Sequence, residues 1–263
     1  GLRDGPLRIW DNESGTERPQ LEGHHDEVFD CAVSSDGATI VSASADYTLI
    51  VWDAERLIAR RTLRGHSGNV TSCALTSDGA TVVSLSADGT LIVWDGRRGS
   101  KRWSMQTAGG RTSRCAVSGD GMSVAVGLPD GTITAWDADT GVESLAVMGH
   151  DDEVLDCVFS LDGHLIVSAS ADQTLKVWDA HTGMALATLM GHSDRVTSCA
   201  ISADSTTIVS MSEDQTIRVW DRGSSRERMI ITGHTSTFVD TRRRCAISAD
   251  GTIAVSLSSS IVD

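Results

Sequence analysis

A repeat with a period of 42 residues runs through this chain and constrains its fold more than any other feature. Six Trp-Asp pairs mark the period: Trp10-Asp11, Trp52-Asp53, Trp94-Asp95, Trp136-Asp137, Trp178-Asp179 and Trp220-Asp221. Gly-His pairs follow the same spacing at Gly23-His24, Gly65-His66, Gly149-His150, Gly191-His192 and Gly233-His234. Because self-similarity at a fixed period of about 20–50 residues is typical of solenoids and propellers, the chain is expected to be an array of like units.

Each period carries the pattern of an antiparallel β-sheet. Residues 65–106 contain four short runs rich in apolar residues: Val70–Leu75, Thr81–Ser86, Thr90–Trp94 and a weaker Lys101–Gln106. Asp-Gly turns separate the first three runs, which is typical of a meander of short strands. No stretch shows the period of about 3.6 residues that an amphipathic helix requires, so helices are expected to be nearly absent.

A four-stranded unit with Gly-His near its start and Trp-Asp near its end resembles the WD40-repeat family, and the resemblance covers the whole chain. It implies an all-β closed β-propeller whose blades are small twisted sheets. It also implies a hydrogen-bonded tetrad in each blade. The matching residues are His24, Ser42, Asp46 and Trp52; His66, Ser84, Asp88 and Trp94; His150, Ser168, Asp172 and Trp178; and His192, Ser210, Asp214 and Trp220.

One period departs from this pattern. Ala108 stands where the tetrad has histidine and Val126 where it has serine, so that only Asp130 and Trp136 remain. Since buried polar partners support one another, losing two of them predicts that this blade is the least stable.

The repeat predicts six four-stranded blades in a single domain, residues 1–263. Five blades span approximately residues 23–64, 65–106, 107–148, 149–190 and 191–232. The sixth combines residues 233–263 with residues 1–22 and would have the tetrad His234, Ser256, Asp4 and Trp10. A second offset of 126 residues, or three blades, agrees with a six-bladed ring. The alternatives are a seven-bladed ring or a fragment of a larger array.

Composition and charge favour a protein partner. The formal net charge of −14 argues against a nucleic-acid surface, although half of the acidic residues occupy turn and Trp-Asp positions that the fold explains. No apolar run approaches the roughly 18 residues of a membrane span. The six cysteines recur once per blade, which predicts buried thiols that form no disulfides, a reducing compartment and a cytoplasmic location.

The sequence offers little for catalysis. It has no nucleophile elbow, phosphate-binding loop or dinucleotide fingerprint, and no His or Cys pair has zinc-ligand spacing. We therefore expect no enzyme activity, no cofactor and no metal.

The best candidates for partner binding are charged residues just before or within the first strand of each blade, where the repeats differ. They are Glu27, Asp30, Arg111, Arg114, Glu153, Asp156, Arg195, Arg243 and Arg244. In a six-bladed ring these acidic and basic blades would form a charge-alternating rim able to orient a protein or peptide, or a second copy of the chain.

The predicted function is a non-catalytic protein-interaction or scaffold module. The closely similar repeats resemble the sensor or regulatory propellers of larger bacterial or fungal signalling proteins. The alternative is a glycan-binding propeller, for which Trp103 is the one tryptophan outside the repeat pattern.

Overall fold

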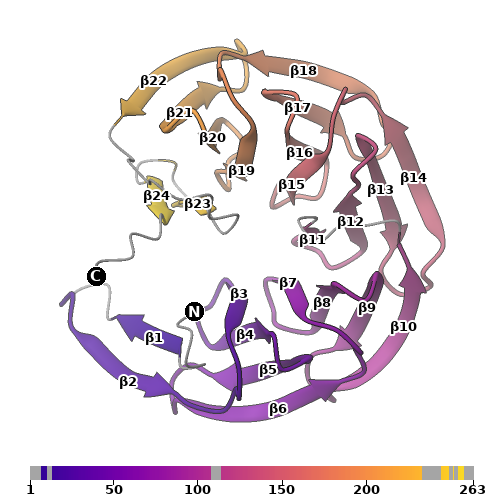
Figure 1. Ribbon diagram of the computed structural model, residues 1–263, viewed down its shortest axis with the longest axis vertical. Coiled ribbons are helices and arrows are strands. Elements are labelled where there is room, and N and C mark those ends of the chain that lie inside the picture. Colours follow the sequence, from indigo (N-terminus) through magenta and orange to yellow (C-terminus); the bar gives the residue numbers. More distant parts are fainter. Residues whose placement is uncertain are drawn as a thin grey trace. The chain divides into compact units, whose positions relative to one another are not determined.

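The computed structural model describes residues 7–10, 14–107, 114–232, 244–248, 251 and 254–257. Throughout these residues the regular secondary structure is β-strand, as predicted, and no helix occurs (Figure 1). No membrane-spanning helix therefore exists within the described ranges. The chain divides into two compact units, residues 1–111 with 139–141, and residues 112–138 with 142–263.

The first unit holds a two-stranded sheet and two four-stranded sheets. Strands β1 (Leu7–Trp10) and β2 (Glu17–Leu21) form the small sheet. The first complete blade is β3 (Val28–Val33), β4 (Thr39–Ser44), β5 (Thr48–Asp53) and β6 (Ile58–Arg64). The second is β7 (Val70–Leu75), β8 (Thr81–Ser86), β9 (Thr90–Asp95) and β10 (Ser100–Gln106), whose bounds match the predicted runs to within a residue.

The second unit repeats this arrangement. Its blades are β11 (Cys115–Val117), β12 (Ser123–Gly127), β13 (Thr132–Asp137) and β14 (Glu143–Met148); then β15 (Val154–Phe159), β16 (Leu165–Ser170), β17 (Thr174–Asp179) and β18 (Ala185–Met190); then β19 (Val196–Ile201), β20 (Thr207–Ser212), β21 (Thr216–Asp221) and β22 (Arg226–Thr232). A two-stranded sheet of β23 (Arg244–Ile247) and β24 (Ala254–Leu257) follows.

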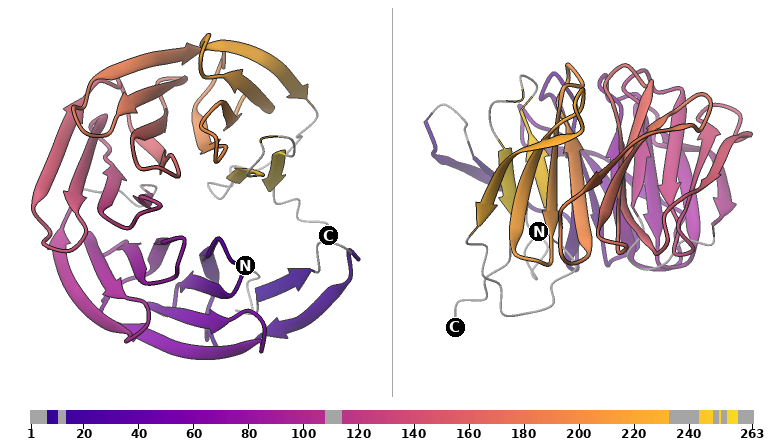
Figure 2. Two further views of the ribbon diagram at one scale, coloured as in Figure 1. Left: turned by 180° about the vertical axis from the view of Figure 1, so that it is seen from behind. Right: turned by 90° about the horizontal axis from the view of Figure 1, so that it is seen from above.

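Local turn chemistry sets the meander within each sheet, which Figure 2 shows from two further sides. In the β7–β8 turn, Gly79 adopts a φ of 68°, a left-handed conformation that suits glycine. The Asp78 carboxylate accepts the Ala80 N–H at 2.9 Å. The same aspartate-to-backbone bond recurs at Asp36, Asp120, Asp162 and Asp204. Much of the negative charge therefore holds turns closed.

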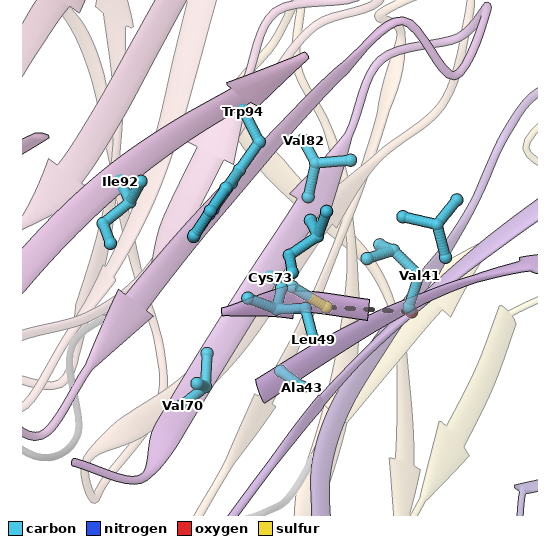
Figure 3. Packing of buried hydrophobic residues seen from close by; sticks show 10 residues of the cluster. Val41, Ala43, Leu49, Val70, Cys73, Val82, Ile92 and Trp94 are labelled. Atoms are coloured by element: carbon cyan, nitrogen blue, oxygen red, sulfur yellow. Dashed lines mark hydrogen bonds between the residues drawn. The ribbon is translucent and has the colours of Figure 1, made fainter. Parts of the chain in front are cut away.

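Consecutive sheets within each unit pack through their first strands, β3 against β7, and β11, β15, β19 and β23 in series. In the first unit, Val41 and Leu49 of one blade form a core cluster with Val70, Cys73 and Trp94 of the next (Figure 3). A hydrogen bond from a thiol joins the two sheets there, because Cys73 Sγ lies 3.8 Å from the Val41 carbonyl oxygen. One blade thus completes the core of its neighbour.

Five complete four-stranded blades are described, and the predicted composite blade is not among them. Its tetrad partners His234 and Asp4 lie outside the described residues. Trp10, on β1, is 55% exposed, whereas Trp52, Trp94, Trp136, Trp178 and Trp220 are all buried. Six blades and a closed ring therefore remain predictions.

Candidate functional site

The polar group at the centre of each regular blade is the predicted tetrad. In the sheet of β15–β18, His150 Nε2 lies 2.7 Å from Ser168 Oγ, and Trp178 Nε1 donates to the same oxygen at 2.8 Å. His150 Nδ1 lies 2.7 Å from Asp172 Oδ2. The serine hydroxyl on β16 therefore connects the tryptophan on β17 with the histidine in the segment before β15.

The same geometry recurs in two other blades and is modified in one. The tetrads of His24 and His192 match that of His150 in partners and distances. In the β7–β10 blade, His66 Nδ1 instead lies 2.7 Å from the Thr90 hydroxyl, and its distance to Asp88 Oδ2 is 3.6 Å. Thr90 in turn donates to Asp88, so the threonine links histidine and aspartate there.

The electrostatics of the tetrads suit a structural role. Burial lowers the pKa of His66, His150 and His192 below the ordinary value of 6.5, which leaves them neutral at neutral pH. Burial by itself would raise the pKa of the Asp46 and Asp214 carboxyl groups. Hydrogen bonds from a threonine hydroxyl, backbone N–H groups and the tetrad histidine nevertheless bring it down to about 2. Every polar atom is thus occupied within the blade.

These shifts predict acid sensitivity. A histidine whose folded pKa lies below 6.5 takes up a proton more readily in the unfolded chain, so the free energy of unfolding should fall as the pH drops below about 6.5. The aspartates, whose folded pKa is lowered, stabilise the fold above about 3.8, and that stability is lost as the pH falls towards 2.

Urea titrations followed by circular dichroism from pH 7.5 to pH 5 measure the histidine part. His25→Gln, on an exposed turn outside the tetrad, should keep the same slope as the parent. A free energy of unfolding that stayed constant over this interval would contradict the assignment.

The third blade has apolar packing where the other complete blades have the tetrad. Val126, in the serine position, is buried, and Trp136 donates no hydrogen bond within the described part of the chain. Gly127 lets Val154 of the next blade approach, because an added Cβ would lie 2.4 Å from the Val154 side chain. Strand β11 has three residues, where the first strands of the other four complete blades have six. The short first strand and the missing polar partners agree with the predicted weakness of this blade.

The cysteines are structural thiols. All six lie in described residues and none forms a disulfide; five are buried and Cys31 is exposed. Burial raises the pKa of Cys157 and Cys199, and that of Cys245 to about 12, so these thiols stay protonated. Cys199 Sγ lies 3.5 Å from the Val167 carbonyl oxygen of the preceding blade. No cluster of three or more potential metal ligands occurs among the described residues.

Two predicted rim residues are buried instead of lining an exposed rim. Asp30 and Asp156 are 5% and 9% exposed, and their carboxylates accept the backbone N–H groups of Cys73 and Cys199 at 2.9 and 3.1 Å. The cause is a β-bulge at the start of both strands, between Val28 and Asp30 in β3 and between Val154 and Asp156 in β15. A bulge places two residues opposite one and redirects the side chain, here towards the next sheet.

The structure also brings predicted rim residues of opposite charge together. Glu153 and Arg195, from consecutive blades, form an ion pair of 3.2 Å with both side chains partly exposed. Arg114 Nε lies 4.0 Å from the largely buried Asp156 carboxylate.

The other predicted residues are only partly described by the structure. Glu27 is half-buried. Arg244 begins β23, and Arg111 and Arg243 lie outside the described residues. Trp103, the residue considered for sugar binding, is half-buried against Gly141.

Comparison with known proteins agrees with the repeat. The family model described as WD domain, G-beta repeat matches residues 15–53, 59–95, 142–179 and 183–221, which together make up more than half of the chain. These segments pass over residues 96–141, which contain the departing positions Ala108 and Val126.

Coronin-7 of Rattus norvegicus is 42% identical over 43 residues, or 16% of this chain. The match takes in 5% of Coronin-7, so it concerns a small part of that relative.

Proposed function

Because the chain belongs to the WD40-repeat family, we propose that it is a non-catalytic protein-interaction module. The carrying observation is that the tetrad histidines, serines and aspartates, the groups best suited to chemistry, are occupied within their own blades. The side chains that differ between otherwise similar repeats are therefore the candidates for binding a protein partner. No described feature favours the glycan-binding alternative.

The proposed contact surface is the partly exposed part of the rim, at the start of the first strands. It contains Glu27, Glu153 and Arg195 among the described side chains, and Arg111, Arg243 and Arg244 by repeat position. Arg114, Asp30 and Asp156 support it from beneath, because their ion pair and hydrogen bonds connect neighbouring blades. A protein or peptide of complementary charge is the partner that such a surface selects.

Charge reversal on the rim tests this proposal. Immobilised protein is expected to retain a defined set of proteins from source cells, and Glu27→Arg combined with Arg195→Glu should lower their recovery at least about tenfold. Arg226→Glu, on the exposed strand β22, reverses a charge away from the rim and should leave recovery unchanged. Equal recovery by the rim variant, or no retained protein, would contradict the proposal.

We also propose that β1–β2 and β23–β24 complete one another as a sixth blade that closes the ring. Each is half of the four-stranded unit seen elsewhere, and Trp10 lacks the cover that its counterparts have. Substitution of Trp10, argued below, tests closure.

The wider setting is proposed from the same features. Five buried thiols that form no disulfide suit a reducing, cytoplasmic compartment. The net charge of −14 disfavours nucleic acid, and the closely similar repeats suit the scaffold or sensor propeller of a larger signalling protein. Two copies of the chain could bind one another in the same way, through the oppositely charged residues of their rims.

A further inference from the structure

A cavity of about 490 Å³ lies between the two complete blades of the first unit. Arg60 and Arg61 of β6 line one side of it. The β7–β8 turn contributes Asp78 and Gly79, and the β9–β10 turn contributes Gly96 and Arg97. The cavity thus lies by the turns after the first and third strands, at the opposite strand ends from Glu27 and the proposed rim.

The arginines of this cavity differ in how firmly they are held. Arg60 is fixed, because its guanidinium donates to Asp53 and to the Thr39 hydroxyl. Arg97 pairs with Asp78 at 3.2 Å, but its side chain is 72% exposed, so water screens the pair. Arg61 donates to the Arg60 carbonyl oxygen and forms no ion pair within the described part of the chain. Arg61 and Arg97 therefore keep donor groups available to a ligand.

Glycines bring the walls of the cavity close together. A Cβ added to Gly96 would lie 2.4 Å from the Gly79 carbonyl oxygen, so a larger residue would displace the β9–β10 turn. A Cβ at Gly99 would lie 3.3 Å from Cδ of Arg61, which shows that the arginine stem rests on this glycine. The packed stem limits the positions that the Arg61 guanidinium can adopt, which reduces the entropy lost on binding.

Arg61 and Arg97 have no arginine counterpart in the other repeats, whereas Arg60 recurs as Arg228, which likewise donates to an aspartate and a threonine, Asp221 and Thr207. At the offset of 126 residues, Arg61 and Arg97 become Ala187 and Gly223, whereas Asp78 keeps its counterpart Asp204. The fold forms around the second set as well, so the first set is not needed for folding. Further basic residues lie near the cavity in sequence, Arg56, Arg64, Arg98 and Lys101, in a chain whose net charge is −14.

We propose that this cavity binds an oxyanion side chain, carboxylate or phosphoryl, of an acidic polypeptide segment. The guanidinium forks of Arg61 and Arg97 would hold the oxyanion, since arginine matches such groups with paired hydrogen bonds. The surrounding arginines steer the segment towards the site. A polypeptide is favoured over nucleic acid because the chain has a net charge of −14 and the carboxylate of Asp78 lies in the same cavity, both of which disfavour a polyphosphate backbone. This surface is separate from the rim proposed above.

Anisotropy measurements with a fluorescent peptide of alternating serine and glutamate test the proposal at near-physiological salt. A phosphoserine version and a glutamine version serve as further probes, and the tighter of the two acidic peptides identifies the oxyanion. We expect saturable binding of at least one acidic peptide and none of the glutamine peptide. Arg61→Ala with Arg97→Gly, which installs the residues found 126 positions later, should weaken binding at least about tenfold.

Arg64→Ala with Arg98→Ala is the matched control, because it removes the same charge from residues that do not line the cavity. It should weaken binding less than about threefold. Arg61→Gln with Arg97→Gln keeps side-chain length and replaces the first pair if that pair misfolds. The proposal is overturned if neither acidic peptide binds, if the control loses as much as the cavity variant, or if a single-stranded oligonucleotide binds as tightly.

Discussion

Replacing Trp178 by alanine is expected to lower the free energy of unfolding by about 3–5 kcal/mol, because the ring is buried within the core of two consecutive blades. Trp178 is 3% exposed and belongs to a cluster with Val154 and Ile166. Its indole N–H is hydrogen-bonded to Ser168, and an added Cβ at Gly149 would lie 2.5 Å from the ring. Urea unfolding followed by circular dichroism measures the loss.

Phenylalanine substitutions separate packing from hydrogen bonding. Trp178→Phe keeps an aromatic ring but leaves the Ser168 hydroxyl without the indole N–H donor, at a cost of about 1–2 kcal/mol beyond the change in size. Trp136→Phe has no such bond to lose, because valine replaces the serine of its blade, and should cost less. Equal losses at the two positions would show that the tetrad bond contributes nothing. Trp178→Phe also gives a result if the alanine variant fails to fold.

Trp10→Ala extends the comparison to the proposed sixth blade. An exposed hairpin residue is expected to change stability by less than about 0.5 kcal/mol. If β23–β24 cover β1–β2, the loss should instead approach that of Trp178→Ala. If light scattering gives the mass of a monomer, the strands that cover Trp10 belong to the same chain. A small loss would contradict closure.

The strands and the tetrads could be predicted because their causes are local and repeated. Asp-Gly turns define the strand ends, and the structure returns Val70–Leu75 and Thr81–Ser86 with the predicted bounds. The histidine, serine and tryptophan positions follow from one matched repeat and recur in four blades. The pattern also occurs in six periods, so that a departure in one period does not hide it.

The rim could not be predicted as well, since burial there depends on a bulge that leaves no mark in the residue pattern. Asp30 follows Phe29 on an apparent strand alternation, yet the shifted register turns its carboxylate towards Cys73 of the next blade. The pairing of Glu153 with Arg195 likewise depends on distances between blades. The basic cavity did leave a signal in the sequence, because Arg61 has no arginine counterpart at the 126-residue offset, but only the fold shows that Arg97 lines the same cavity.

Asp156→Ala is expected to lower the free energy of unfolding by about 3 kcal/mol, because the carboxylate holds one blade to the next. Its Oδ2 accepts the Cys199 N–H at 3.1 Å and the Ser198 hydroxyl at 2.9 Å, and Arg114 lies on its other side. Ser198 Oγ in turn accepts the Cys245 N–H at 3.2 Å, so the connection continues to β23. Urea unfolding measures the loss, and Asp151→Ala, at an exposed position, should cost less than about 0.5 kcal/mol.

Hydrogen exchange gives this prediction a local readout that a general loss of stability would not reproduce. Asp156→Ala should increase exchange of the Cys199 amide selectively, whereas Asp30→Ala, its counterpart 126 residues earlier, should do so for the Cys73 amide. Each variant removes the acceptor of one amide and leaves the other in place. Exchange that rose equally at both amides would show that the carboxylates act through global stability. Selective exchange would establish that these buried carboxylates connect particular pairs of blades.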